Sequence, residues 1–249
     1  MALTTLRTVI NRVLTAVGET PVAAIVTDLT TLVQLKALEF INQIKEEIEE
    51  ASQWRSLRQT FAVTVAPNTN STAIAGTDER ARVIRIPAPQ AGQLVPLVFD
   101  VTAANNQIAL FEIPLAELLY RVKQDSGQTV VQPDRFAVDN TSGQCVLYVY
   151  PTPNTSRSIS IAMHVPQATL VHTDLDTGIL TPTLPLIKGA IWYIQLDRGE
   201  EMGPGGAFTE ERYRTSLDDA IARDNAESGT VDQLVTDQIP WWGMIGGQQ

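Results

Sequence analysis

The chain has 249 residues, of which 18 are basic and 28 acidic, so its net charge is −10, and 44% of its residues are hydrophobic. This length is enough for one large domain or two modest ones. No apolar run is long enough to cross a membrane, and the acidic balance leaves no cluster of Lys and Arg to bind nucleic acid through its phosphates. Cys145 is the single cysteine, so an intrachain disulfide is excluded, and its apolar surroundings predict a buried strand residue.

The first predicted element is a helix over residues 3–17. Thr4 or Thr5 can cap its first turn, and Gly18 supplies a left-handed stop. Its apolar residues are spaced for a helix rather than bunched as in a signal peptide, so we expect no export. The residues predicted to share its apolar face are Leu6, Val9 or Ile10, Val13 and Val17.

The second element, residues 28–53, is predicted to be one long amphipathic helix of about 39 Å, capped by Thr27 or Asp28. The short linker before it favours an antiparallel packing of the first two helices. The opposite face carries Glu46, Glu47, Glu49 and Glu50, which we interpret as solvated. The predicted bundle core consists of Leu32, Leu35, Leu38, Ile41, Ile44 and Ile48.

From residue 59 to residue 166 the hydrophobic period changes from 3.6 to 2. Groups of alternating apolar residues, bounded by Pro, Asn, Gly or Asp, predict short antiparallel strands. One short helix is predicted directly after Pro114. Strands at this spacing favour an inserted antiparallel β-sandwich or barrel-like domain.

Helical character returns in residues 167–227, with one helix beginning near Pro185 and a last helix over 208–226. A Gly-rich break at 203–206 separates them. The predicted fold is therefore α+β, with an antiparallel helical bundle formed by residues 1–58 and 167–227 and the β domain inserted between these segments. The expected apolar face of the last helix contains Tyr213, Leu217, Ala220 and Ile221.

Residues 228–249 lack a convincing helical pattern and are predicted to form an extended C-terminal arm. Trp241 and Trp242 either fold back onto their own bundle or act as aromatic anchors in a pocket of a partner, because buried Trp often dominates interface energy. The candidate partner-binding residues of the arm are Ile239, Pro240, Trp241, Trp242 and Met244.

The sequence contains no P-loop, paired CxxC, HExxH or GxSxG motif, so we expect no enzyme activity, no cofactor and no metal site. His164 and His172 have no companion ligands in the sequence and are interpreted as strand-end or loop residues. Asp174 and Asp176 stand near Gly178, yet the spacing and terminal Glu of a calcium loop are missing.

Three stretches resemble the head-to-tail adaptor proteins of short-tailed bacteriophages, the group called tail tubular protein A. The opening VINRVLTAVGETPV is similar to that family's first helix and its G-E-x-P-V turn. The long helix closes at Trp54, similar to the aromatic residue that ends the family's long helix. The segments PDRFAV (133–138) and LYVYPTPNTSRSISIAMHVP (147–166) are similar to the family's strand and Pro-x-Pro arrangement.

This resemblance implies a structural virion protein at the head-tail junction, made in the host cytoplasm. Twelve copies would form a ring that binds the portal protein through the C-terminal arm and the tail nozzle protein on its other side. DNA would pass through the channel of the ring without sequence-specific binding, which fits the acidic composition, because a negative wall releases no counterions to hold the duplex. No membrane partner is implied.

Two other functions stay open. The β domain could serve a tail-associated receptor- or carbohydrate-binding protein, with the helices as an oligomerising stem, although it has no Trp between Arg55 and Ile191. An acid/base hydrolase using two carboxylates is the third reading, and no residue spacing supports it.

Overall fold

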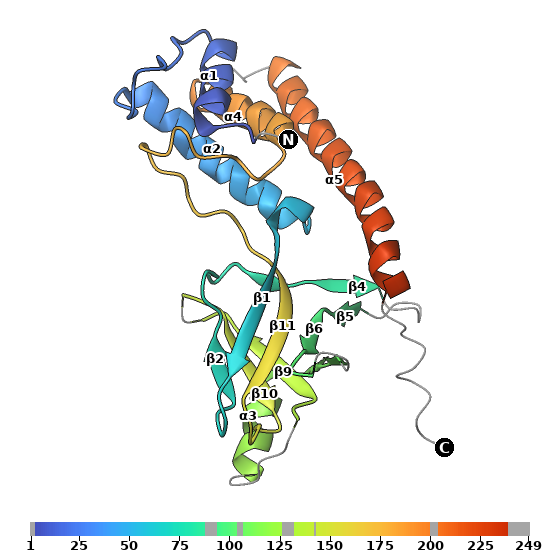
Figure 1. Cartoon of the computed structure of the whole chain (residues 1–249). Coiled ribbons are helices and arrows are strands. Elements are labelled where there is room, and N and C mark those ends of the chain that lie inside the picture. The colour runs from blue at the N-terminus through green and yellow to red at the C-terminus, as the bar shows by residue number, and fades with distance from the viewer. Residues whose placement is uncertain are drawn as a thin grey trace. The chain divides into compact units, whose positions relative to one another are not determined.

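The computed structural model describes residues 3–87, 94–103, 107–125, 132–141, 143–199 and 204–238. It divides the chain into two compact units. Residues 1–56 and 167–249 form a helical unit, and residues 57–166 form a β unit (Figure 1). The fold is α+β, as predicted, because the helices and the sheets belong to different stretches of the chain.

Helix α1 (Leu6–Ala16) begins at Thr5, whose side chain accepts a hydrogen bond from the backbone N–H of Thr8. Gly18 ends this region with a φ of +76°, a conformation that glycine adopts without steric cost. The linker that follows is fixed to α1, because the amide of Asn11 both accepts from Val22 N (2.7 Å) and donates to Val22 O (3.1 Å). The helix buries one apolar face formed by Leu6, Val9, Ile10, Val13 and Leu14.

Helix α2 (Leu32–Ala51) is shorter than predicted, with 20 residues and a length of about 30 Å. Its cap is Thr31 rather than Thr27 or Asp28, and Thr31 forms a capping box with Gln34. The predicted core residues Leu38, Ile41, Ile44 and Ile48 are buried. Leu32 and Leu35 do not belong to this core, because their side chains are 71% and 39% exposed.

Helix α4 (Thr183–Asp197) occupies the centre of the helical unit, since it contacts α1, α2 and α5. Helix α5 (Pro204–Gln238) begins inside the predicted Gly-rich break. It also continues through residues 228–238, so the prediction of an extended arm is wrong for this stretch. The predicted arm residues from Ile239 onward lie outside the described residues. None of the described helices is both long and apolar enough to cross a bilayer.

The β unit contains two sheets and a separate hairpin. The first sheet has the order β1-β11-β6-β7, with β3 also paired to β11, and the second has the order β2-β10-β9-β8. The β4–β5 pair forms the hairpin. The strands are β1 (Arg58–Val65), β2 (Ser71–Ala73), β3 (Arg82–Val83), β4 (Arg85–Pro87), β5 (Leu94–Pro96), β6 (Val98–Asp100), β7 (Ile108–Ala109), β8 (Phe111–Glu112), β9 (Arg135–Asp139), β10 (Val146–Tyr150) and β11 (Arg157–His164).

Most pairs are antiparallel, as predicted, whereas β8 runs parallel to β9. Parallel neighbours require a crossover connection, and α3 (Leu115–Gln124) lies in the chain between these two strands. Helix α3 follows Pro114, at the predicted position, and buries Leu118.

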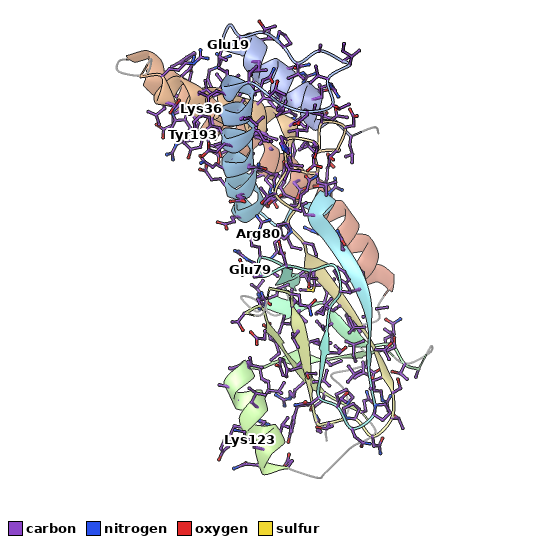
Figure 2. All side chains as sticks on the ribbon, turned by 90° about the vertical axis from the view of Figure 1, so that its left-hand side faces the viewer. Glu19, Lys36, Glu79, Arg80, Lys123 and Tyr193 are labelled. Atoms are coloured by element: carbon purple, nitrogen blue, oxygen red, sulfur yellow. The ribbon has the colours of Figure 1, made fainter. Side chains whose placement is uncertain are left out.

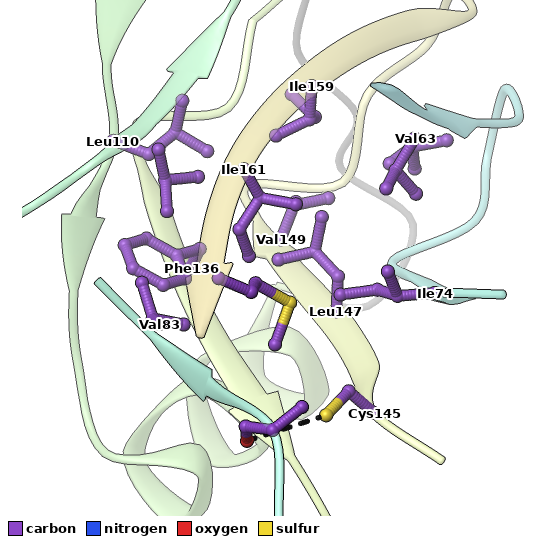
Figure 3. Packing of buried hydrophobic residues seen from close by; sticks show 14 of the residues in the cluster. Val63, Ile74, Val83, Leu110, Phe136, Cys145, Leu147, Val149, Ile159 and Ile161 are labelled. Carbon is purple, nitrogen blue, oxygen red and sulfur yellow. Dashed lines mark hydrogen bonds between the residues drawn. The ribbon is translucent and has the colours of Figure 1, made fainter. Parts of the chain in front are cut away.

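One hydrophobic cluster receives side chains from both sheets of the β unit (Figure 3). Ile159 and Ile161 of β11 point into it because alternate residues of a strand face the same side. Cys145 is fully buried at its edge, where its thiol lies 3.7 Å from the carbonyl oxygen of Ala81. Burial raises the pKa of this thiol, so Cys145 is a structural residue, as its sequence context predicts.

Candidate assembly surface

The centre of the helical unit depends on a close approach between α2, α4 and α5. Gly189 of α4 lies where a Cβ atom would meet Ile44 of α2 at 2.8 Å and the ring of Tyr213 of α5 at 3.0 Å. Glycine is therefore the residue that allows the three helices to pack this tightly. Any larger side chain would push at least one neighbouring helix outward.

Glu47 joins the same three helices at their surface. Its Oε1 accepts a 2.6 Å hydrogen bond from the hydroxyl of Tyr193 on α4, and its Oε2 accepts a 3.2 Å bond from the hydroxyl of Tyr213 on α5. The bond to Glu47 raises the pKa of Tyr193 to about 12. The pKa of Tyr213 is also raised, mainly because its ring is buried and also because Glu47 is negatively charged.

Aromatic rings extend this contact along the unit. Trp192 stacks on Tyr193 with 4.9 Å between ring centroids and on Tyr213 with 5.9 Å, and Phe40 of α2 stacks on Tyr193 at 5.9 Å. Trp192, Tyr193, Tyr213 and Glu47 line a hollow of about 410 Å³. Neighbouring rings already cover much of each aromatic face, so we interpret the cluster as a packing element that holds three helices together.

The acidic face of α2 is not uniformly solvated. Glu47 and Glu50 are exposed, as predicted, but Glu49 is only 2% exposed and pairs with the fully buried Lys45 at 3.2 Å. The backbone of Gln167 completes this site, because its carbonyl accepts from Lys45 Nζ at 2.6 Å and its N–H donates to Glu49 at 3.0 Å. The prediction that Glu49 is solvated is therefore wrong. The segment that begins at Gln167 thus contributes a hydrogen-bond acceptor for Lys45 and a donor for Glu49.

Ion pairs fix both ends of the helical unit. At one end Lys36 of α2 binds Asp197 of α4 at 2.7 Å, and Arg198 binds Glu19 at 2.6 Å. Figure 2 labels Lys36, Tyr193 and Glu19 on this part of the unit. At the other end Arg55 pairs with Asp224 and Glu227 of α5. These ion pairs join the two ends of α2 to the C-terminal end of α4 and to the middle of α5.

Arg55 and Asp224 also line a groove of about 410 Å³ together with residues 179–183. The hydroxyl of Thr181 in this groove is buried and has no hydrogen-bond partner among the described residues.

The histidines and the loop carboxylates occupy the positions expected for structural residues. His164 ends β11 and is buried, and its burial lowers its pKa. His172 lies in a loop, 3.9 Å from Asp28. Asp174 accepts a hydrogen bond from the backbone of Val171 at 2.9 Å. The described residues contain no group of three or more His, Cys, Asp or Glu side chains placed to hold a metal ion.

The outer stripe of α2 is apolar at its N-terminal end and polar beyond it. Leu32 and Leu35 are followed on this stripe by Glu39, and all three side chains are exposed. On α5, Phe208 is 56% exposed, and the guanidinium of Arg212 lies 5.2 Å from its ring centroid. Each of these two surfaces therefore combines exposed apolar and charged side chains on one helix.

The charge of the protein is concentrated on the helical unit. Of the 18 basic residues, 10 belong to the helical unit and 8 to the β unit, whereas the 28 acidic residues divide into 20 and 8. The β unit is therefore neutral, and the helical unit carries the whole net charge of −10. The sequence alone showed the total, but only the division into units showed where it resides.

A family model, described as SU10 adaptor protein, matches residues 4–234 of the chain. The chain belongs to this family, because the match covers nearly the whole sequence. It is a phage adaptor, a structural class of virion protein, and membership implies binding to portal and tail components. The prediction of a phage adaptor family is confirmed, while the place at the head-tail junction and the closer likeness to tail tubular protein A stay predictions. No curated protein matches the chain.

Proposed function

We propose that the protein is a head-to-tail adaptor whose copies form a ring of twelve between the portal protein and the tail nozzle protein. The family match over residues 4–234 is the observation that carries this proposal. The role is structural rather than catalytic. In the assembled virion the protein lies at the head-tail junction, and DNA passes through the channel during ejection.

The distribution of charge supports the helical unit as the part that lines the channel. A surface with twice as many acidic as basic residues repels the phosphate backbone at short range and offers no counterion release. Salt screens this repulsion beyond about 10 Å, so the wall keeps DNA from adhering without blocking its passage. The neutral β unit has no comparable reason to face DNA.

The predicted arm residues Ile239, Pro240, Trp241, Trp242 and Met244 remain the proposed contact with the portal. They follow α5 directly, and this helix extends to Gln238. Nothing in the comparisons favours the carbohydrate-binding alternative.

Electron microscopy of the full chain mixed with its cognate portal tests this function. We expect a ring of density added to one face of the portal, with one adaptor copy for each portal subunit. The protein alone is an uninformative sample, because subunits of this kind can stay monomeric until a template ring is present. A portal that stays bare at high adaptor concentration would contradict the proposal.

A further inference from the structure

Two exposed surfaces of the helical unit, one on α2 and one on α5, lie at the same height along the helix axes. Helix α4 runs antiparallel to α2, since Lys36 binds Asp197 and Glu47 binds Tyr193. It also runs antiparallel to α5, since Trp192 stacks on Tyr213 and the start of α4 lies beside Ala220. Helices α2 and α5 therefore run in the same direction on either side of α4 (Figure 1).

These contacts also give the level of Phe208, by which we mean its position along the common direction of the helix axes. Asp197 lies five residues after Trp192 on α4, and Phe208 lies five residues before Tyr213 on the antiparallel α5. Five residues advance a helix by about 7.5 Å, so Phe208 is level with Asp197. Because Asp197 binds Lys36, Phe208 is also level with the turn of α2 that contains Leu35.

The two surfaces carry the same order of side chains. On α2, the apolar Leu35 is followed four residues later by the acidic Glu39, and both are exposed. On α5, the apolar Phe208 is followed four residues later by the basic Arg212, and both are exposed. Residues four apart lie on one face of a helix, so each surface presents an apolar and a charged group in the same direction. The apolar groups match in level, and the charges are opposite.

We propose that the α2 surface of one copy binds the α5 surface of the next copy, with Leu35 against Phe208 and Glu39 against Arg212. This proposal rests on the proposed ring. Rotation about an axis that runs along these helices keeps every residue at its own level, so the two surfaces of neighbouring copies meet in register. The contact is heterologous, with a different patch on each side, which is the kind of interface that closes a ring.

Disulfide trapping distinguishes this contact from a symmetric one. The full chain is made with Leu35→Cys, with Phe208→Cys, and with both changes, and each form is oxidised on portal rings and separately at high concentration. The native Cys145 is buried and serves as the internal background. We expect a ladder of linked multimers from the double variant, and linked dimers from a mixture of the two single variants at least tenfold above either alone. The control pair is Leu35→Cys with Asp218→Cys, since Asp218 is exposed on a different face of α5.

Charge reversal gives an independent readout. Glu39→Arg and Arg212→Glu are each expected to reduce ring occupancy on the portal at least tenfold, and the chain with both changes is expected to regain it. If rings form but Leu35→Cys links to itself, or the chosen pair links no better than the control, the interface is wrong while the proposed function stands. If no ring forms with the unmodified chain, both the function and the interface are overturned.

Discussion

The phenol of Tyr193 donates a 2.6 Å hydrogen bond to Oε1 of Glu47, which connects α4 to the exposed side of α2. The other oxygen of the same carboxylate accepts from Tyr213 on α5. One surface residue of α2 thus links this helix to α4 and α5, which lie more than 130 residues further along the chain. We propose that copies of this protein form a ring around a channel. In such a ring, these hydrogen bonds would hold the exposed surfaces of α2 and α5 in fixed positions relative to each other.

Replacing Glu47 by Ala is expected to lower the free energy of unfolding of the helical unit by about 1–2 kcal/mol, because two hydrogen bonds to a charged acceptor are lost at a partly solvated site. Urea denaturation followed by far-UV circular dichroism measures the change. Glu50→Ala is the matched control, since Glu50 is exposed on the same helix. Equal stability of the two variants would show that the carboxylate does not link the helices.

Stability is expected to fall as the pH rises from 10 to 12. The ordinary pKa of tyrosine is 10.0, and the folded protein raises that of Tyr193 to about 12. The protonated phenol therefore favours folding, this contribution is fully present below pH 10, and it disappears as the pH passes the folded value. Comparison of the native chain with Tyr193→Phe at several pH values isolates the effect. The variant should lose less stability over this interval than the native chain, and parallel curves would contradict the assignment.

Breaking the buried ion pair between Lys45 and Glu49 is expected to lower the free energy of unfolding strongly. Lys45→Met leaves Glu49 charged in a buried site, at an expected cost of about 3–5 kcal/mol. Adding Glu49→Gln removes the buried charge and keeps an oxygen for the N–H of Gln167, so the double variant should recover part of that loss. A double-mutant cycle measured by chemical denaturation gives the coupling. Additive losses would show that the two side chains do not interact.

Aspartate placed on opposite faces of α2 is expected to give opposite outcomes. Ile41 is fully buried, so Ile41→Asp should abolish folding, and Leu38→Asp should do the same. Leu32 is 71% exposed, so Leu32→Asp should leave a folded chain with an unchanged thermal transition. Circular dichroism and thermal melting distinguish the cases. A folded Ile41→Asp chain would show that the buried stripe has been assigned to the wrong face.

The chain with both Trp241→Ala and Trp242→Ala is expected to fold normally and to bind the portal more weakly. The two residues follow α5 in the sequence and belong to the proposed portal-binding arm. Co-sedimentation with portal rings measures the binding, and circular dichroism checks the fold. Normal binding by a folded double variant would rule out the Trp pair as the anchor.

Local patterns in the sequence predicted much of the secondary structure because they depend on neighbouring residues. The apolar spacing of residues 3–17 predicted α1, and the period-2 alternation of apolar residues in 59–166 predicted the strands of the β unit. The predicted ends of the long helices were less accurate. Thr27, Asp28 and Thr31 are all suitable cap residues, but only Thr31 is followed three residues later by a Gln that completes a capping box, a local signal that the prediction missed. Residues 228–238 lack a strong apolar stripe, so periodicity gave no sign that α5 continues.

The sequence by itself determined the α+β class, the order of helices and strands, the acidic balance and the likeness to phage adaptors. Only the tertiary structure decided that α4 is the central helix, that Glu49 is buried, that Leu32 and Leu35 are exposed, and that the net charge belongs to one unit. The physical reason is that a helical period identifies which residues share a face but not what covers that face. The residues that bury such a face can come from segments more than a hundred residues away in the sequence, as Gln167 does for Lys45.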